Sequence, residues 1–515
     1  MKPPSGNAAQ YFVDRHRIGP IAEKLAFVEG GGGGRSLSYA DLVFESDRMA
    51  GLYQRHGIRR DERAAMLVHD VIEFPVIFWG SLKCGVVPVP LNTLLTPDIY
   101  QSILNDSQAA ILFVSANLLA TVASVLPHCP ELRQIIVLGG EGDEVPQFAN
   151  ELANSNPLTM IESAPDAIAF WLYSSGSTGA PKGVRHVHSS LQATAETYGA
   201  QILKIQTDDT VFSAAKLFFA YGLGNSMSFP MSVGATAVLN AGRPTPAAVF
   251  DVIQRTRPTI FCGVPTLYAA MLSEMDGTIR EGCDGFRRCI SAGEALPADA
   301  GERWQDLTGT EILDGVGSTE LLHIFLSNAP DNVEFGTSGV AVPGYEMRLV
   351  NEDGGPVADD EIGELLVTGP SAAADYWNRP EKNDATFQGG WTRTGDKYQR
   401  RADGRLIYCG RTDDMFKVSG NWVSPFEVEQ VLASHPSVLE AAIVPRRDRD
   451  GLEKPQAYIV LQPEADPIGL KPELQALVKS NAAKWSYPRW IEFVDALPKT
   501  ATGKIQRFKL RAQSR

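Results

Sequence analysis

The stretch Ser174–Gly183 reads SSGSTGAPKG, and it begins directly after the apolar run Ile168–Tyr173. The apolar run has the length and composition of a buried strand, so the sequence predicts a strand that leads into a loop of small and hydroxylated residues. Such a loop lets backbone N–H groups approach phosphate oxygens, hydroxyl groups add donors, and Lys182 adds a positive charge. It is not the P-loop of the common NTPases, because Pro181 precedes the lysine and the Gly-Lys order is reversed. The stretch predicts a phosphate-binding loop.

The whole chain has the size and composition of a multidomain globular protein. Its 515 residues exceed the length at which one hydrophobic core stops growing, and 44% of them are hydrophobic. The net charge of −14 opposes binding to nucleic acid or anionic lipid, so neither partner is expected and local groups must hold anionic ligands. The six cysteines are scattered without a C-x-x-C pair, which indicates neither a zinc site nor a disulfide framework and fits a reducing cytoplasm.

Neither of the two segments that could serve for targeting or membrane insertion has the required composition. Residues 1–16 are polar and lack the charged and then apolar layout of a secretory signal. Residues 107–127 are uncharged, but polar residues interrupt them, whereas a membrane span needs roughly 20 apolar residues. We expect a strand over 110–114 followed by a short helix, and no membrane association.

Short β-branched or apolar runs alternate with helical patterns in the N-terminal part of the chain. Residues 64–68 precede a helical pattern at 72–84, and residues 236–240 precede one at 246–255. This alternation predicts βαβ units, largely parallel sheets and an α/β fold.

The pattern changes near Gly336 and again near Asp413. Short strands with Gly and Asp turns follow Gly336, and a helix, two strands and a second helix are expected beyond Asp413. We therefore predict a large N-terminal domain, residues 1–412, of two stacked α/β subdomains plus a β-rich subdomain. A small mobile α+β domain, residues 413–515, is expected to follow it.

Four further strings follow the phosphate loop in order, and all five together resemble the signature motifs of the adenylate-forming superfamily. This superfamily contains acyl-CoA ligases, adenylation domains of peptide synthetases, and luciferases. The resemblance implies AMP-forming activation of a carboxylic acid with ATP, Mg²⁺ and CoA, and no tightly bound prosthetic group. The four strings are Gly315–Glu320 (GVGSTE), Gly390–Asp396 (GWTRTGD), Gly410–Asp414 (GRTDD) and Pro498–Lys504 (PKTATGK).

The resemblance assigns most of these residues to the nucleotide. Thr319 and Glu320 match the positions that hold the phosphates and Mg²⁺, which prefers hard oxygen ligands. Asp396 resembles the ribose-binding aspartate, and Arg411 resembles the arginine near the same ribose and phosphate. The predicted ATP- and AMP-binding set is Ser174, Ser175, Gly176, Ser177, Thr178, Gly179, Lys182, Gly293, Glu294, Ala295, Asp314, Gly315, Thr319, Asp396 and Arg411.

Lys504 resembles the near-C-terminal lysine that bridges the substrate carboxylate and the AMP oxygens while charge rearranges at the α-phosphorus. It forms the predicted catalytic set with Thr319 and Glu320. In the superfamily the small domain rotates after the adenylate forms, and Asp413 matches its hinge. The face that this rotation presents for thiol attack is expected to bind CoA through Lys417, Ser419, Gly420, Asn421 and Trp422.

The strings 216–225, 321–328 and 416–429 resemble benzoate-CoA ligases more closely than fatty-acid or acetate enzymes. Small residues beside Tyr221 and Ile324 predict a flat slot for one aromatic ring. The acyl pocket implied by the resemblance is Ala220, Tyr221, Gly222, Ala292, Gly317, His323 and Ile324.

A polar ring substituent would require a partner in this pocket. His323 and Ser291 are candidates, although His323 is equally interpretable as a structural histidine. Benzoate, 4-hydroxybenzoate, 3-hydroxybenzoate and 2-aminobenzoate all stay open as substrates. His186 and His188 suggest a general base, but a carboxylate is already ionised at neutral pH and needs none. We expect at least one of these two histidines to serve packing or to gate the pocket.

Two other functions compete with the CoA ligase. An aryl-acid adenylation enzyme that loads a carrier-protein thiol predicts no dependence on free CoA, and no carrier-like tail follows Lys504. A nonenzymatic binder of nucleotide or aryl acid is expected to lack Lys504 or Glu320, and both are present. The sequence therefore favours the ligase.

Overall fold

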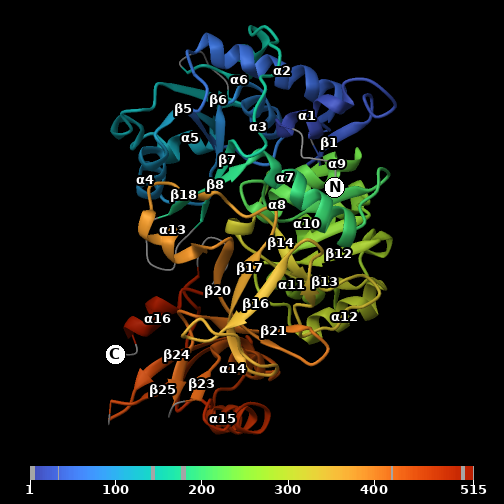
Figure 1. The fold of residues 1–515 in the computed structure, drawn as a ribbon. Helices are drawn as coiled ribbons and strands as arrows, with labels where there is room; N and C mark the ends of the chain where they lie inside the picture. The colour runs from blue at the N-terminus through green and yellow to red at the C-terminus, as the bar shows by residue number, and fades with distance from the viewer. Residues whose placement is uncertain are drawn as a thin grey trace. The chain divides into compact units, whose positions relative to one another are not determined.

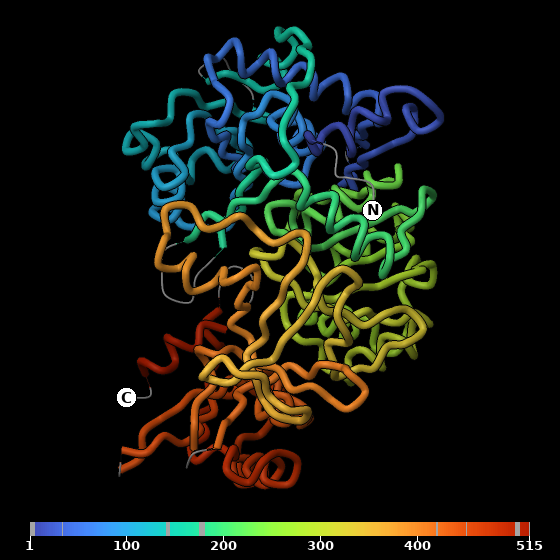
Figure 2. The backbone as a smooth tube through the Cα atoms, viewed as in Figure 1, coloured from blue at the N-terminus to red at the C-terminus, as the bar shows by residue number. Residues whose placement is uncertain are grey.

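The structure is a computed structural model that describes residues 6–32, 34–140, 145–174, 181–418, 421–449, 451–499 and 505–513. The chain divides into two compact units, and its course is drawn in Figures 1 and 2. The larger unit contains Met1–Glu346 and Val367–Thr392, and the smaller unit contains Met347–Leu366 and Arg393–Arg515. The smaller unit thus includes residues before Asp413. The predicted domain boundary at Asp413 stays a prediction. The hinge at the same residue concerns a motion and also stays a prediction.

A parallel sheet of four strands, in the order β4-β3-β5-β6, lies near the N-terminus of the larger unit. Every residue of β5 is buried, as expected for a central strand of a parallel sheet that is covered on both faces. β5 and helix α5 (Ala116–Val122) confirm the interpretation of residues 107–127. None of the described helices has the length and hydropathy to cross a membrane. The strands are β3 (Arg63–Leu67), β4 (Val87–Pro90), β5 (Ala109–Ser115) and β6 (Gln134–Leu138).

A second sheet of nine strands has the order β15-β14-β13-β12-β11-β9-β10-β1-β2. Its central strands run parallel, and antiparallel pairs close both edges. Gly263, Ser291 and Asp314 are therefore neighbours across β11, β12 and β13 at the carboxyl ends of these strands, where α/β sheets bind ligands. The strands are β1 (Leu25–Glu29), β2 (Ser36–Ser38), β9 (Thr210–Ser213), β10 (Thr236–Leu239), β11 (Ile260–Gly263), β12 (Arg288–Ser291), β13 (Ile312–Gly317), β14 (Ile324–Ser327) and β15 (Val340–Ala341).

A third sheet, β18-β8-β7, is small and antiparallel. It consists of β7 (Ile168–Ser174), β8 (Lys182–Val187) and β18 (Asp375–Tyr376), and β7 packs beside β4. The predicted strand before the phosphate loop is confirmed as β7.

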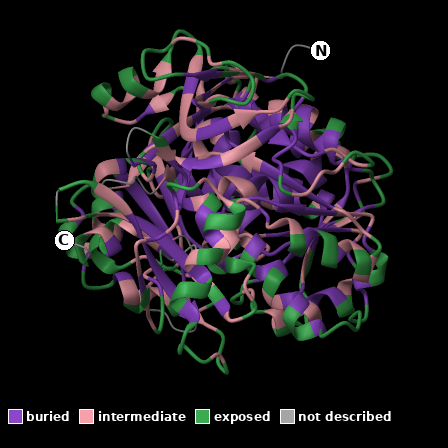
Figure 3. Ribbon diagram, turned by 90° about the horizontal axis from the view of Figure 1, so that it is seen from below, coloured by how far each residue is buried: buried purple, intermediate pink, exposed green. Residues whose placement is uncertain are grey.

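Helices surround these sheets, with buried residues toward the strands and exposed residues outward (Figure 3). Helix α2 begins at a capping box formed by Ser38 and Asp41, and α10 begins at Thr245 followed by proline. The helical segments are α1 (Ala8–Phe12), η1 (Asp14–His16), α2 (Tyr39–Arg55), α3 (Glu73–Cys84), α4 (Pro97–Ser107), η2 (Leu126–His128), α6 (Phe148–Ala153), α7 (His188–Thr194), η3 (Ala195–Ile202), α8 (Ala220–Leu223), η4 (Gly224–Ser228), α9 (Phe229–Val233), α10 (Pro246–Thr256), α11 (Pro265–Met275), η5 (Cys283–Gly285), α12 (Ala298–Thr308), η6 (Thr319–Leu321) and α13 (Pro380–Thr386).

The C-terminal part of the chain is rich in short strands, as predicted, and the α/β fold class with a small α+β C-terminal part is confirmed. One sheet has the order β16-β17-β20-β19 with β21 on β20, β22 pairs with β23, and a third sheet is β24-β25-β26. The elements are β16 (Glu346–Val350), β17 (Ile362–Thr368), β19 (Phe387–Gln388), β20 (Trp391–Arg400), β21 (Leu406–Arg411), β22 (Phe416–Val418), β23 (Asn421–Val423), α14 (Pro425–Ala433), β24 (Val438–Arg447), β25 (Glu453–Leu461), α15 (Leu470–Asn481), β26 (Trp490–Phe493) and α16 (Arg507–Gln513).

Helix α3 carries a fully buried ammonium group that joins three helical segments of the larger unit. Lys83 Nζ lies 2.6 Å from Asp14 Oδ1 on η1 and 2.6 Å from Asp47 Oδ1 on α2. Arg17, which is half exposed, pairs with the same two carboxylates from the surface. The buried lysine therefore neutralises two acidic groups that would otherwise repel each other.

Lys83→Ala should lower the free energy of unfolding of the larger unit by about 3 kcal/mol, because breaking a buried ion pair leaves uncompensated charge. Urea unfolding followed by the fluorescence of Trp79, which is buried in the same helix, measures this change. The matched control Arg17→Ala removes a half-exposed partner of the same carboxylates and should cost about 1 kcal/mol or less. Equal losses in the two variants would contradict the assignment.

Candidate active site

The β7–β8 hairpin forms the stem of the predicted phosphate loop. Ser174 and Lys182 are paired across the hairpin, directly where the loop leaves it. The side-chain hydroxyl of Ser174 is buried and has no hydrogen-bond partner among the described residues. The two predicted phosphate contacts at the ends of the loop are thus brought side by side. The predicted residues Ser175, Gly176, Ser177, Thr178 and Gly179 lie outside the described residues.

Side chains from distant segments brace this stem. The Tyr173 hydroxyl donates to Asp106 Oδ2 at 2.7 Å, and Arg379 donates to Asp106 Oδ1 at 2.8 Å. The Trp377 backbone N–H donates to the Gly183 carbonyl, and its indole N–H donates to the Asp106 carbonyl, at 2.8 and 2.9 Å. Residues 377–379 are therefore linked to both strands of the stem, to β8 directly through Gly183 and to β7 through Asp106.

The turn Thr319–Leu321 follows β13, and each of its three carbonyl groups accepts a hydrogen bond from outside the turn. The first bonds to His186 Nε2, the second to the Ala373 N–H and the third to the Ser371 hydroxyl, at 2.8, 2.8 and 2.7 Å. The next residue, Leu322, is buried with a φ of +65°, a conformation that costs energy for a residue with a branched side chain. The surrounding contacts impose this conformation, and strained residues of this kind cluster at functional sites.

Glu320 and Lys182 meet at one aromatic side chain, Tyr376. The Tyr376 hydroxyl donates to Glu320 Oε1 at 2.9 Å, and Lys182 Nζ lies 4.2 Å from the centre of the Tyr376 ring. The ammonium group and the carboxylate predicted to act on the nucleotide phosphates are therefore gathered at one place, although 138 residues separate them in the sequence. Tyr376 was not predicted from the sequence. The aromatic pair Tyr376-Trp377 before Asn378-Arg379-Pro380 was the signal available.

Both histidines after the phosphate loop have structural roles, which confirms the expectation that at least one serves packing. His186 is fully buried, stacks on Phe170 with ring centres 5.1 Å apart, and donates to the Thr319 carbonyl. His188 Nδ1 accepts the Ala8 N–H at 3.2 Å. Burial lowers the pKa of each imidazole to about 4, so both are neutral at pH 7.

Contacts with neighbouring residues hold the predicted acyl segment, residues 216–225, in place. Both oxygens of the buried Asp70 carboxylate accept the Leu217 N–H, at 3.2 and 3.3 Å. A side chain at Gly222 would place its Cβ 2.0 Å from the Lys216 carbonyl oxygen, so the chain can fold back only with glycine there. The Tyr221 hydroxyl donates to backbone carbonyls at the ends of β11 and β12, which points this ring at the carboxyl end of the nine-stranded sheet.

His323 lies at the centre of an aromatic cluster beside this segment. Its ring centre is 4.5 Å from that of Phe229, 5.3 Å from that of Tyr198 and 5.6 Å from that of Tyr221. Nε2 lies 3.3 Å from the Tyr221 carbonyl oxygen, and burial lowers the pKa of the imidazole to about 3. A Cβ at Gly224 would lie 2.4 Å from this ring. The structure therefore brings the predicted residues His323 and Tyr221 together in one neutral cluster.

The other predicted pocket residues line the neighbouring strand ends. Ile324 is buried on β14, where its side chain leaves no room for a Cβ at Gly315, and Gly317 is exposed at the end of β13. Ala292 is buried directly after β12, next to Ser291. Asp314 is buried, and burial raises the pKa of its carboxyl group to about 8. Its Oδ1 has no hydrogen-bond partner among the described residues, and neither has the hydroxyl of Ser291.

The predicted adenine-lining segment Gly293–Ala295 follows β12 and is accessible. Gly293 and Glu294 are exposed, and Gly293 has a φ of +102°, which favours glycine. The segment therefore begins at the carboxyl end of β12, where Ser291 lies beside Asp314 of β13.

In the smaller unit, the two predicted ribose contacts form an ion pair. Asp396 on β20 and Arg411 on β21 are direct neighbours across the strand pair, and Arg411 Nη1 lies 3.0 Å from Asp396 Oδ1. The same Nη1 donates to the Thr394 carbonyl at 2.8 Å. The ion pair fixes the orientation of the aspartate, whose role in binding ribose stays a prediction.

The predicted CoA segment forms the hairpin β22–β23, and Ser419 and Gly420 lie outside the described residues. Asn421 opens β23, and Lys417 pairs with Trp422 across the hairpin. The ammonium groups of Lys417 and Lys397 lie 4.5 and 4.7 Å from the centre of the Trp422 ring. Lys417 also forms an ion pair with Glu352 at 3.0 Å, and Lys397 is buried, so both ammonium groups are held by contacts within the smaller unit.

Lys504 also lies outside the described residues, but both ends of its loop are fixed. Residues Lys499 and Ile505 form a β-bridge, and the Gln506 N–H donates to the Pro498 carbonyl at 2.8 Å. Arg507, the first residue of α16, pairs with Glu429 at 2.6 Å and with Asp414 at 3.3 Å. Arg511 on the same helix donates to the carbonyl of Asp413, the predicted hinge residue.

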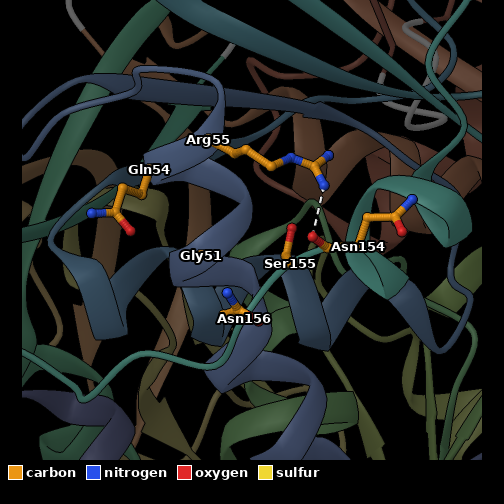
Figure 4. A pocket seen from close by; sticks show the side chains of 6 residues that line it. All are labelled: Gly51, Gln54, Arg55, Asn154, Ser155 and Asn156. Carbon is orange, nitrogen blue, oxygen red and sulfur yellow. Dashed lines mark hydrogen bonds between the residues drawn. The ribbon is translucent and has the colours of Figure 1, made fainter.

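A surface pocket with a volume of about 280 Å³ lies elsewhere, between α2 and the segment after α6 (Figure 4). Arg55 donates to the Asn154 carbonyl at 2.9 Å and also pairs with Glu151, so its charge is already neutralised. None of the predicted site residues lines this pocket, whose lining is Gly51, Gln54, Arg55, Asn154, Ser155 and Asn156.

Comparison with protein families gives a match over most of the chain. Residues 17–377 match the model of the AMP-binding enzyme family, and residues 427–504 match the model of the AMP-binding enzyme C-terminal domain. The chain belongs to the AMP-binding enzyme family. The first match covers the phosphate-loop stem, Glu320 and Tyr376, and the second covers the loop of Lys504.

Relatives of known activity are similar over nearly the whole chain. The 4-hydroxybenzoate–CoA/benzoate–CoA ligase of Rhodopseudomonas palustris is 51% identical, and the match covers 98% of this chain and 94% of the relative. The benzoate–CoA ligase of Thauera aromatica is also 51% identical, with 98% and 96% covered. The crystal structures of a benzoate CoA ligase from Burkholderia xenovorans LB400 match with a TM-score of 0.90, 47% identity and coverage of 98% of this chain and 99% of that chain. The anthranilate CoA ligase AuaEII with anthranoyl-AMP matches with a TM-score of 0.93, 39% identity and coverage of 100% and 98%.

The role of His186 predicts a specific dependence of stability on pH. Its pKa is about 4 in the folded protein and near 6.5 when unfolded, so the unfolded chain binds more protons between these values. The stability that this group contributes is present above pH 6.5 and is lost as the pH falls toward 4, with a total of about 3 kcal/mol. His186→Gln keeps a donor for the Thr319 carbonyl but does not titrate. Its melting temperature should therefore fall less steeply than that of the wild type between pH 6.5 and 4.

Adenylation by His186→Gln should keep the wild-type dependence on pH from 6 to 9, because His186 Nε2 is bonded to the Thr319 carbonyl and an ionised carboxylate needs no general base. If the wild type lost activity as the pH fell through about 6.5 and His186→Gln did not, the structural role of His186 would be contradicted.

Proposed function

We propose that this protein is an ATP-dependent, AMP-forming aryl-CoA ligase that converts benzoate, or a hydroxy- or aminobenzoate, to its CoA thioester through an aroyl adenylate. The observation that carries the proposal is the gathering of Lys182 and Glu320 at Tyr376, beside the stem of the phosphate loop. Similarity to ligases for benzoate, 4-hydroxybenzoate, 3-hydroxybenzoate and anthranilate supports the substrate class. We place the enzyme in the cytoplasm, because all six cysteines are free thiols.

In the first half-reaction, a carboxylate oxygen of the aryl acid attacks the α-phosphorus of ATP. A bond forms between that oxygen and phosphorus, the bond to the bridging oxygen breaks, and pyrophosphate leaves. The carboxylate is ionised at neutral pH, so no base is needed. Lys182 is placed to balance phosphate charge at the mouth of the loop, and Lys504 is proposed to balance the charge that develops around the α-phosphorus.

The residues present are suited to hold Mg²⁺ together with ATP. The Tyr376 hydroxyl occupies Oε1 of Glu320, and Oε2 has no hydrogen-bond partner among the described residues. No cluster of three or more metal-binding side chains occurs in the part of the chain that the structure describes. One carboxylate supplemented by substrate phosphates and water is the usual coordination of Mg²⁺ in nucleotide sites. The bound ion supplies positive charge that stabilises the phosphates and the leaving pyrophosphate.

In the second half-reaction, the thiol of CoA attacks the acyl carbon. A C–S bond forms, the bond from the acyl carbon to the AMP oxygen breaks, and the thiol proton is released. We propose that Asp413 is the hinge for the domain rotation between the two steps. In this proposal Lys417 and Trp422 then face the thiol channel, and the Lys417 ammonium group exchanges its present partner, Glu352, for a phosphate of CoA.

The polar lining of the acyl pocket supports a hydroxylated or aminated ring as well as benzoate. A carbonyl oxygen only accepts hydrogen bonds, so His323 Nε2 carries the proton that bonds to the Tyr221 carbonyl. The imidazole is neutral, and Nδ1 is therefore an acceptor. It is buried and has no partner among the described residues. A ring hydroxyl or amino group can donate to this nitrogen, whereas benzoate cannot.

A panel of acids tests the function. Benzoate, its hydroxy, amino and fluoro derivatives, cinnamate, hexanoate and acetate are each incubated with ATP, Mg²⁺ and CoA, and AMP and acyl-CoA are followed by mass spectrometry. Small benzoates should give the highest kcat/KM, because the proposed pocket residues Tyr221, Ile324 and His323 leave room for one aromatic ring and not for a long chain. Release of AMP without acyl-CoA would instead indicate an enzyme that loads a carrier protein.

Lys504→Ala separates the two half-reactions. Adenylate formation should fall by several orders of magnitude, because the charge next to the α-phosphorus is lost. Thioester formation from added aroyl-AMP and CoA should stay close to the wild-type rate. Rapid-quench measurement of both steps checks this, and an equal loss in both would contradict the assignment of different faces to the two steps.

A further inference from the structure

We propose that Tyr376 is a positioning residue that holds Glu320 and Lys182 in the geometry needed to receive Mg²⁺ and the ATP phosphates. The proposal rests on the proposed function and adds to it a residue that contacts neither the aryl acid nor CoA in that scheme. The contacts that carry it all lie within the larger unit: the hydrogen bond from the Tyr376 hydroxyl to Glu320 and the ammonium group of Lys182 over the Tyr376 ring.

The backbone on both sides of the hydrogen bond is fixed, so the bond determines where the carboxylate lies. On one side, the three carbonyl groups of Thr319–Leu321 are each bound from outside the turn. On the other side, Asn383 of α13 binds both backbone polar groups of Tyr376, accepting its N–H at 2.7 Å and donating to its carbonyl at 3.0 Å. The remaining freedom is the rotation of the Glu320 side chain, and the Tyr376 hydroxyl restricts it.

The Tyr376 side chain is itself rigidly packed. It is 3% exposed and lies in a small apolar cluster with Val184, Ala373 and Phe387. Its ring centre is 5.1 Å from that of Phe387. Because β18 pairs with β8, Tyr376 is opposite Val184, two residues from Lys182. The ring face is therefore available at the position where the Lys182 ammonium group lies.

This arrangement has a direct consequence for the metal. A hydroxyl donor on Oε1 fixes the plane of the carboxylate and leaves Oε2 for a cation. The ring face attracts the Lys182 ammonium group through a cation–π contact. Tyr376 thus holds the acidic and the basic group through two different parts of one side chain, its hydroxyl and its ring.

Tyr376→Phe tests the hydroxyl group alone, because the ring and the packing stay. The Mg²⁺ concentration for half-maximal pyrophosphate exchange should rise about 10-fold, since a hydrogen bond to a charged group is lost. The KM for the aryl acid and the rate of thioester formation from added aroyl-AMP should not change. A readout that requires no turnover is the melting temperature with ATP and increasing Mg²⁺, in the absence of acid and CoA. Half of the ATP-dependent shift should require about 10-fold more Mg²⁺ than in the wild type.

Tyr53→Phe is the matched control. It removes the hydroxyl of another fully buried tyrosine, which is bonded to Ser81 at 2.7 Å between α2 and α3, and should leave the Mg²⁺ dependence unchanged. Tyr376→Leu removes the ring as well and should additionally raise the KM for ATP. Wild-type Mg²⁺ dependence in Tyr376→Phe, or the same change in both Phe variants, would overturn the proposal. Failure of the wild type to activate any benzoate would refute the proposed function, whereas the melting experiment would still test Tyr376.

Discussion

The structure depends most on how the turn Thr319–Leu321 is held at the end of β13. This turn belongs to no helix long enough to be stable by itself, and Leu322 directly after it has a positive φ. Hydrogen bonds from β8 and from residues 371–373 hold its three carbonyl groups. Because β8 also forms one side of the stem of the predicted phosphate loop, the same contacts link this stem to Glu320. The proposed metal-binding carboxylate and the loop stem are thus held by one set of hydrogen bonds.

Side chains held by specific partners also explain how a chain with a net charge of −14 can bind two polyanionic substrates, ATP and CoA. The positive groups described at the proposed sites are each held in place by an aromatic ring or by a carboxylate partner. Lys182 lies on Tyr376, Lys417 and Lys397 lie on Trp422, and Arg411 is held by Asp396. The buried histidines near the nucleotide and acyl segments are neutral, so they contribute no positive charge. Local placement of charge, and not the average field, supports anion binding.

Much of this architecture could be predicted from the sequence, because strand and helix patterns are local and the motifs have fixed order. The patterns predict β7 before the phosphate loop, α3 and α10 near their observed positions, and the order of α14, β24, β25 and α15 beyond Asp413. The motifs also predict that Glu320 and Lys182 belong to one site. The contacts that hold the site could not be predicted. Tyr376 and Glu320 are 56 residues apart, and Trp377 and Asp106 are 271 residues apart. No periodicity or local motif reports such pairs, which arise only when the small β18-β8-β7 sheet closes.

The most direct test of the account is to follow the oxygen atoms of the acid through the first half-reaction. Benzoate labelled with ¹⁸O in both carboxylate positions is converted with ATP, Mg²⁺ and CoA, and the products are analysed by mass spectrometry. If the carboxylate attacks the α-phosphorus, AMP gains one ¹⁸O and pyrophosphate gains none. Label in pyrophosphate or phosphate, or benzoyl-CoA formed with unlabelled AMP, would contradict an acyl-adenylate route and with it the roles given to Glu320, Lys182 and Lys504.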